Sequence, residues 1–312
     1  MRQNQNISTL QAVVTKKTSG SYEVKSDQGT LPCTSKSNGK PEEIIVVGDR
    51  VTIGQTTAGW VILQREPRTN WLSRRSAVPM PTARAHEQIF VANVDQLVTV
   101  FAAANPAPKW NMLDRYLVAA EAQDVPVLIC LTKIDLASTP DGRLNAENQA
   151  AVERYRKIGY PVLLTSTFTG FGMEEFRQAL KGKLSVLVGK SGVGKSSLLN
   201  ALEPGLGLRA KAVSALTGKG RHTTSHMEMF DLAAGGSLVD TPGVREFGLW
   251  DVDPDDLGYC FPEMRDLIGR CRFGLDCSHN EEPGCVIRKA VTAGQISPER
   301  YQSYLTLKDE TT

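Results

Sequence analysis

The chain has 312 residues, of which 41% are hydrophobic and 22% are charged, and its formal net charge is +2. This length suits two or three domains with full cores, and the composition is that of an ordinary globular protein. No apolar run reaches membrane-spanning length and the N-terminus lacks a signal-peptide core, so we expect a cytoplasmic protein.

The charge is unevenly distributed along the chain. Residues 1–80 carry 11 Lys or Arg and 6 Asp or Glu, a net charge of +5, which leaves −3 for the remainder. A basic N-terminal region is compatible with nucleic-acid contact. A solvated basic surface explains the charge alone equally well.

Short β-like runs separated by turn residues make up the N-terminal region, and they cover residues 11–15, 22–24, 44–47, 50–53 and 59–63. This spacing predicts a small β-barrel over residues 1–70, and an OB-fold is the best match. Such barrels often bind RNA, although a purely structural barrel is the alternative. The proline- and arginine-rich residues 66–85 read as a linker.

From residue 88 onward, strands alternate with helical patterns. Apolar runs at 88–92, 96–101, 125–131, 161–165 and 184–188 predict strands, and apolar positions at 113, 116, 117 and 120 predict a helix. Such alternation predicts a parallel, doubly wound α/β domain, over residues 71–250, that binds its ligand at the carboxyl ends of the strands.

The strongest motif is G-x-x-x-x-G-K-S, which follows the run at 184–188 and opens a helical pattern. Backbone N–H groups of such a loop cradle phosphates, Lys195 reaches the β- and γ-phosphates, and Ser196 holds Mg²⁺. The motif predicts a nucleoside triphosphate site. Its binding residues are Gly189, Lys190, Ser191, Gly192, Val193, Gly194, Lys195, Ser196 and Ser197.

A second nucleotide motif, Thr132-Lys133-Ile134-Asp135, follows a buried-looking strand. GTPases place N-K-x-D there, and the Asp carboxylate accepts hydrogen bonds from guanine N1–H and N2 that adenine cannot supply. The Lys133 stem packs along the base. Thr132 replaces the usual Asn, which affects one contact but not the readout by Asp135. Together with the phosphate loop, this motif predicts guanine specificity.

The third motif is D-T-P-G at residues 240–243, where Asp240 holds Mg²⁺ through water and the Gly243 N–H meets the γ-phosphate. A plain turn is the alternative. Val244 stands where Ras-like enzymes carry a water-orienting Gln. In the preceding segment, Thr223 or Thr224 can close on Mg²⁺, and His222 either positions the attacking water or is merely solvated.

Three of the six cysteines lie within fifteen residues in the C-terminal region, which is residues 251–312. The pattern Cys271-x5-Cys277-x-His279-x5-Cys285 offers four soft ligands for one tetrahedral Zn²⁺, and scattered free thiols are the alternative. Four protein ligands leave no open coordination position, which predicts a structural site. Ser297-Pro298 predicts the start of a helix.

The T-K-I-D motif precedes the phosphate loop, which is the reverse of the usual order of these motifs in GTPases. A circularly permuted GTPase with an N-terminal barrel and a C-terminal Cys/His cluster resembles the RsgA (YjeQ) family of small-ribosomal-subunit-dependent GTPases. The likeness covers nearly the whole chain and includes G-K-S-G-V-G-K-S-S-L, G-R-H-T-T and D-T-P-G-V-R-E-F. Ser166-Thr167-Phe168 stands where the family has S-A-L, so Ser166 and Thr167 join the candidate guanine site.

The resemblance implies a multidomain GTPase with an OB-like barrel, a permuted α/β domain and a zinc-binding helical module. It implies that His222 positions water and that Zn²⁺ binds a Cys-Cys-His-Cys set. We expect a monomer that hydrolyses GTP with Mg²⁺, is stimulated by the small ribosomal subunit and its rRNA, and acts in late maturation of that subunit. An RNA-binding assembly scaffold with a structural nucleotide site is the alternative, and Asp135 argues against an ATP-dependent metabolic enzyme.

Overall fold

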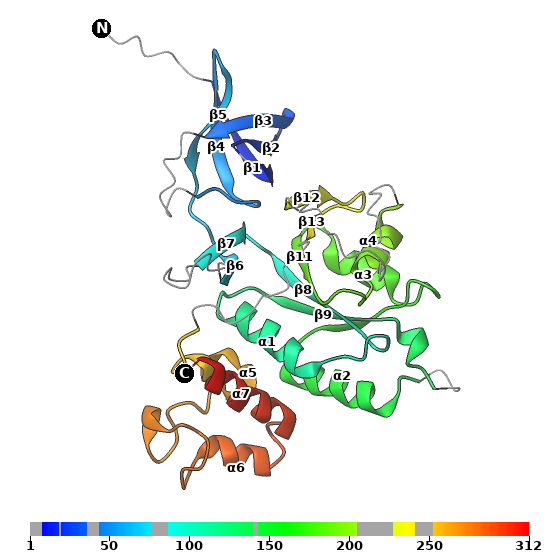
Figure 1. Cartoon of the computed structure of the whole chain (residues 1–312), viewed down its shortest axis with the longest axis vertical. Coiled ribbons are helices and arrows are strands. Elements are labelled where there is room, and N and C mark those ends of the chain that lie inside the picture. Colours follow the sequence, from blue (N-terminus) through cyan, green and yellow to red (C-terminus); the bar gives the residue numbers. More distant parts are fainter. Residues whose placement is uncertain are drawn as a thin grey trace, which may run out of the picture.

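The computed structural model describes residues 8–18, 20–35, 44–75, 87–139, 143–204, 227–240 and 252–311. Three parts follow one another along the chain: a β-barrel, an α/β domain and a helical module (Figure 1). None of the described helices combines the length and apolarity that crossing a membrane requires.

The barrel has five strands, and its core contains Val14, Val24 and Ile53. Adjacent strands pair in the order β1-β2-β3-β5-β4, and a further pairing of β1 with β4 closes the barrel. The predicted barrel is therefore confirmed. The strands are β1 (Thr9–Lys17), β2 (Tyr22–Ser26), β3 (Gly29–Ser35), β4 (Arg50–Thr56) and β5 (Gly59–Arg65).

Two details of the barrel differ from the sequence prediction. The strand β3 was not predicted, because it contains Pro32 and proline is disfavoured within sheets. The run at residues 44–47 forms no strand, although Val47 makes an isolated bridge to Val91. This bridge joins the barrel to the segment that leads into the next domain.

The α/β domain is a doubly wound sheet, as predicted. Strands run in the order β10-β9-β8-β11-β13-β12, where the first five are parallel and β12 is antiparallel. They are β8 (Gln96–Ala102), β9 (Val127–Thr132), β10 (Val162–Leu164), β11 (Leu184–Val188), β12 (Glu228–Asp231) and β13 (Ser237–Asp240).

Side chains alternate along the strands, so the sheet has an apolar core on each face. In β8, Leu97 and Phe101 belong to the core that holds residues of α1 and α2, whereas Val98 and Val100 belong to the core of α3 and α4. The helices are α1 (Trp110–Glu121), α2 (Ala146–Ile158), α3 (Met173–Leu180) and α4 (Lys195–Leu202).

The predicted linker is partly wrong. Within the described part of residues 66–85, β6 (Trp71–Arg75) pairs with β7 (Glu87–Ala92) in a separate two-stranded sheet. Arg68 is buried and pairs with the fully buried carboxylate of Asp49 in the barrel. This segment therefore fixes the barrel to the α/β domain.

The C-terminal module packs on α1 and shares a core with it that includes Val118, Phe261 and Tyr304. Its final helix begins as predicted, since the Ser297 hydroxyl accepts a hydrogen bond from the Arg300 amide. The module contains a 3-10 turn (Leu257–Cys260), α5 (Pro262–Arg265), α6 (Val286–Thr292) and α7 (Pro298–Thr311).

Candidate functional site

The phosphate loop lies between β11 and α4, at the carboxyl end of the central strand. Gly194 has φ +99°, a conformation that favours glycine, and a Cβ at Gly189 would lie 2.3 Å from the Val100 carbonyl oxygen. Lys195 Nζ donates to the carbonyl of Lys190 at 3.0 Å and also to that of Gly189. The loop thus places a lysine amine and the N-terminus of α4 at one edge of the sheet, a suitable setting for an anion.

The T-K-I-D motif, which is predicted to read the base, docks directly on this loop. Buried Thr132 donates its hydroxyl proton to the carbonyl oxygen of Val193 at 2.5 Å, and Lys133 Nζ donates to the carbonyl of Gly192 at 2.6 Å. Two motifs separated by about 60 residues in sequence therefore form one continuous surface. The threonine that replaces the usual asparagine provides a direct tie to the phosphate loop.

Ser166 orients the carboxylate of Asp135. Its hydroxyl donates to Asp135 Oδ1 at 2.5 Å and accepts the amide of Thr169 at 3.2 Å. Ser166 itself is fully buried, so this geometry is well fixed, and Asp135 is half-buried. Thr167 is exposed, and Ile134 packs at the edge of the α1/α2 core.

The predicted hydrolytic residues fall largely outside the described part of the chain. His222, Thr223, Thr224 and Gly243 lie there, and for Asp240 only the backbone is described, as the last residue of β13. That strand pairs with β11, so the Asp240 backbone lies beside the strand that enters the phosphate loop.

The four predicted metal ligands come together. Cys271, Cys277, His279 and Cys285 are buried, and their ligand atoms lie within 4.8 Å of one another. Cys271 Sγ is 3.9 Å from Cys285 Sγ, and His279 Nδ1 is 3.5 and 3.6 Å from these two sulfurs. Zn–S bonds of about 2.3 Å in a tetrahedron give S···S separations of about 3.8 Å, so the cluster has the dimensions of such a site.

The protonation behaviour of the cluster also fits a metal site. Burial raises the pKa of the Cys277 thiol to about 12, so a cation is needed to stabilise the thiolate there. Burial lowers the pKa of His279, which favours the neutral imidazole that metals bind. The amides of Val286 and Arg288 donate to Cys271 and Cys285 Sγ, which stabilises negative charge on these sulfurs.

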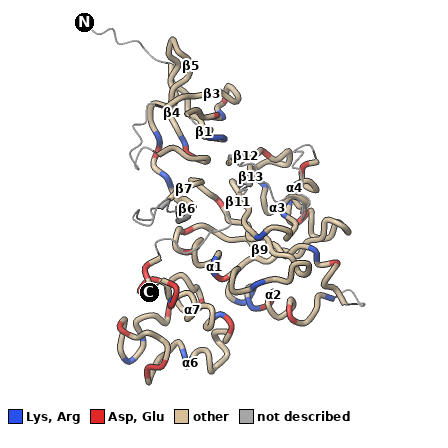
Figure 2. Tube along the Cα trace, in the orientation of Figure 1, with Lys and Arg blue, Asp and Glu red and all other residues tan. Residues whose placement is uncertain are grey.

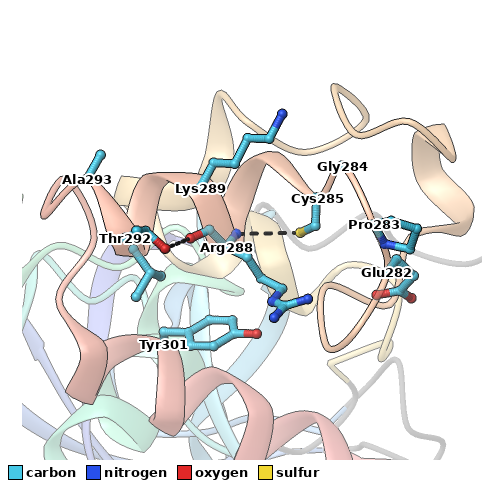
Figure 3. Close-up of a pocket in the computed structure, with 10 residues that line it drawn as sticks. Glu282, Pro283, Gly284, Cys285, Arg288, Lys289, Thr292, Ala293 and Tyr301 are labelled. Atoms are coloured by element: carbon cyan, nitrogen blue, oxygen red, sulfur yellow. Dashed lines mark hydrogen bonds between the residues drawn. The ribbon is translucent and has the colours of Figure 1, made fainter.

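A cavity of about 520 Å³ lies beside the cluster, and Figure 3 shows Arg288, Cys285 and Tyr301 in its wall. The Tyr301 hydroxyl donates to the carbonyl of His279 at 2.6 Å, which braces a residue with φ +61°. Glu282 accepts the amide of Ser278, and this bond holds the Glu282 pKa at about 2. These contacts shape the loop that carries the ligands.

Two supporting residues were not found from the sequence. The carbonyl of Asn105 accepts a hydrogen bond from Lys133, and Tyr301 holds the His279 backbone. Asn105-Pro106 follows the strand β8, and an Asn-Pro pair at the carboxyl end of a central strand is a turn signal beside the expected site. Tyr301 carries no comparable local signal.

The T-K-I-D loop comes first in the chain and docks on the P-loop motif that follows β11. This arrangement defines a circularly permuted P-loop nucleotide-binding protein. The family described as RsgA GTPase matches residues 65–250. The chain therefore belongs to the RsgA GTPase family.

Relatives along nearly the full length support this assignment. The small ribosomal subunit biogenesis GTPase RsgA of Gemmatimonas aurantiaca is 46% identical over 307 residues, which is 96% of each chain. The protein of the same name from Bacteroides fragilis is 37% identical over 308 residues, covering 96% of this chain and 97% of that one.

Solved structures have the same fold. YjeQ from Thermotoga maritima matches with a TM-score of 0.77 and 32% identity, over 97% of this chain and 99% of that chain. YloQ, described as a circularly permuted GTPase, matches with a TM-score of 0.75 and 30% identity, over 100% of this chain and 98% of that one.

Proposed function

We propose that this protein hydrolyses GTP to GDP and phosphate in the biogenesis of the small ribosomal subunit. The observation that carries the proposal is the direct docking of the T-K-I-D loop on the phosphate loop, through Thr132 and Lys133. This contact lets one ligand reach both loops, and Ser166 orients Asp135 toward guanine recognition. The family assignment supports the same activity.

The roles of individual residues follow from the chemistry of phosphoryl transfer. Lys195 and the phosphate-loop amides bind the β- and γ-phosphates, and Asp135 accepts the guanine N–H groups. His222 orients the attacking water, since Val244 cannot. Either Thr223 or Thr224 contacts Mg²⁺ and the γ-phosphate, and the Gly243 amide donates to the γ-phosphate.

Two metals complete the proposal. Ser196 and Asp240 would hold Mg²⁺, which supplies charge neutralisation of the phosphates when bound. Cys271, Cys277, His279 and Cys285 would hold one structural Zn²⁺, because four protein ligands leave no open position for chemistry.

The division of labour is proposed to follow the three parts of the chain. The barrel, residues 1–70, and the zinc module, residues 251–312, would contact the small subunit and its rRNA, while residues 71–250 bind nucleotide. A GTPase without its own glutamine is expected to hydrolyse slowly alone, so we propose stimulation by the small subunit late in its maturation. The protein would act as a monomer in the cytoplasm.

Competition between GTP and ATP tests the nucleotide assignment. We expect GTP to bind at least about 100-fold more tightly than ATP, because adenine leaves the Asp135 carboxylate unpaired. The Asp135→Asn variant should lose most of this preference, whereas Asp309→Asn, an exposed change on α7, should retain it. Equal affinity of the wild-type protein for the two nucleotides would overturn the guanine assignment.

A further inference from the structure

One row of paired residues runs from the barrel to the phosphate-loop strand. Lys16 of β1 pairs with Glu228 of β12, Glu228 pairs with Asp240 of β13, and Asp240 pairs with Leu187 of β11. The barrel strand therefore continues the sheet of the α/β domain and covers its β12 edge. A proposed Mg²⁺ residue, Asp240, lies two strands from the barrel.

Ion pairs reinforce this contact at both ends of β12. Lys16 Nζ lies 3.1 Å from Glu228 Oε1, and Lys25 Nζ lies 2.5 Å from Asp231 Oδ2. Asp231 also accepts the hydroxyl of Ser237, at the start of β13. Figure 2 shows basic segments of the barrel on the side that faces β12. Through Asp231, the charged contacts of the barrel therefore reach β13 as well as β12.

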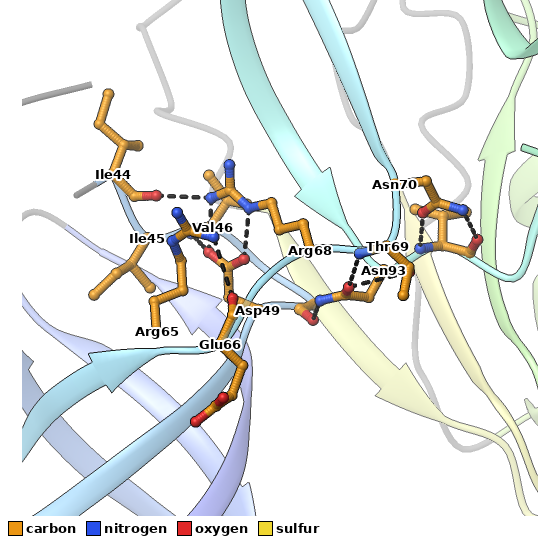
Figure 4. Close-up of polar contacts among 12 residues, drawn as sticks. Ile44, Ile45, Val46, Asp49, Arg65, Glu66, Arg68, Thr69, Asn70 and Asn93 are labelled. Atoms are coloured by element: carbon orange, nitrogen blue, oxygen red, sulfur yellow. Dashed lines mark hydrogen bonds and ion pairs between the residues drawn. The ribbon is translucent and has the colours of Figure 1, made fainter. Parts of the chain in front are cut away.

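The barrel itself is fixed elsewhere, so it can act as a reference for this hairpin. Arg68 makes two hydrogen bonds to buried Asp49, and Asn93 donates to the carbonyl of Gly48 while accepting the Thr69 amide (Figure 4). The Asn93 bonds join the barrel to the turn between β7 and β8, and the Arg68 bonds fix the segment after β5 to the loop before β4. The side chains of Arg68, Asp49 and Asn93 are buried, which makes this junction the firmer of the two.

The contact with the hairpin is weaker by comparison. A cavity of about 580 Å³ lies between barrel and hairpin, with Lys25, Asp231 and Met229 among its lining residues. The side chains of Lys25 and Asp231 are about half exposed, at 50% and 52%. Exposed ion pairs of this kind contribute little to the free energy of folding. They can therefore favour one position of the hairpin without fixing it rigidly.

We propose that Lys16 and Lys25 of the barrel are positioning residues for GTP hydrolysis, acting through the β12–β13 hairpin on the placement of Asp240. In the sequence this hairpin joins the two segments that carry the proposed hydrolytic residues, His222 to Thr224 and Asp240 to Gly243. Displacement of β12 would therefore move the Asp240 backbone, which pairs with Glu228. The inference rests on the proposed function, because it assigns a role in that reaction.

A charge exchange tests it. Lys25→Glu and Asp231→Lys should each raise the Mg²⁺ concentration for half-maximal hydrolysis about fivefold and lower kcat, with KM for GTP changed less than twofold. The double variant, which exchanges the charges, should recover wild-type values within about twofold. Lys16→Met should act in the same direction. Gln64→Glu, an exposed change on β5 at a residue that does not line this cavity, is the control and should have little effect.

The outcomes separate the inference from the function on which it rests. Unchanged Mg²⁺ dependence in Lys25→Glu and Asp231→Lys, or failure of the exchange to rescue, would overturn the positioning role. Absence of any GTP hydrolysis in the wild-type protein would instead refute the proposed function. In that case, amide exchange at Glu228–Asp231 tests whether the barrel positions the hairpin. Faster exchange in Lys25→Glu than in the wild-type protein would support this role, and equal exchange would contradict it.

Discussion

Replacing Arg300 by Met should strongly destabilise the contact between the C-terminal module and the α/β domain. The guanidinium is 1% exposed, and it donates to Asp114 Oδ1 at 2.7 Å and to Glu263 Oε1 and Oε2 at 2.6 and 3.1 Å. It also lies 4.4 Å from the ring centroid of Phe261. Methionine keeps most of the volume but leaves two buried carboxylates uncompensated.

The size of the effect follows from this burial. Removing one partner of a buried ion pair costs about 3–5 kcal/mol, whereas an exposed pair contributes about 0–1 kcal/mol. A loss of about 4 kcal/mol corresponds to a change of about 10³ in an equilibrium constant. Arg265→Met is the matched control, because Arg265 is 49% exposed and pairs with Glu121 at 2.8 Å.

Native-state amide exchange of α1 and α7 is the suitable assay, since a single unfolding free energy is not well defined for a chain of several parts. We expect Arg300→Met to reduce protection in both helices by about 10³, and Arg265→Met by less than about tenfold. Adding Asp114→Asn and Glu263→Gln to Arg300→Met should restore part of the protection. A loss below tenfold in Arg300→Met would refute the reasoning from burial.

Four further predictions concern the nucleotide and metal sites. His222→Ala should lower GTP turnover by about 10²–10⁴ while leaving GTP affinity unchanged, as measured by single-turnover hydrolysis and equilibrium binding. Lys195→Ala should abolish nucleotide binding and support of subunit assembly, whereas full retention of function would favour a scaffold. Thr132→Val removes the hydroxyl that bonds the Val193 carbonyl, so GTP and GDP affinities should fall together, by about tenfold. A chelator should release one Zn²⁺ per chain and reduce amide protection in α6, and Cys277→Ala should have the same effect without a chelator. Retained protection after metal removal would contradict a structural role.

The parts of the fold that depend on local chemistry could be predicted from the sequence. The barrel and the doubly wound sheet follow from short-range periodicity, and both are confirmed. Ligands bind at the carboxyl ends of parallel strands, and this rule also predicts that Thr132 lies close to the phosphate loop. Three Cys and one His within fifteen residues likewise predict the observed cluster.

The parts of the structure that depend on contacts between distant residues could not be predicted from the sequence. The strand β3 is not predicted because it contains Pro32, which has no backbone N–H to donate. The sequence does not show that this position in the sheet accepts a proline. Nothing near Lys16 reveals that it pairs with Glu228, since the register between strands more than 200 residues apart is set by tertiary packing. From the sequence, Arg300 looks like an ordinary exposed helix residue. Only the structure shows that it is buried between two acidic partners from distant segments, Asp114 and Glu263.

GTP hydrolysis with and without purified small ribosomal subunits tests the central claim most directly. We predict slow turnover by the protein alone and an increase of many-fold when small subunits are added, with large subunits as the matched control. His222→Ala should remain slow in both conditions. Equal rates with and without small subunits would contradict the account of this protein as a GTPase that small ribosomal subunits activate.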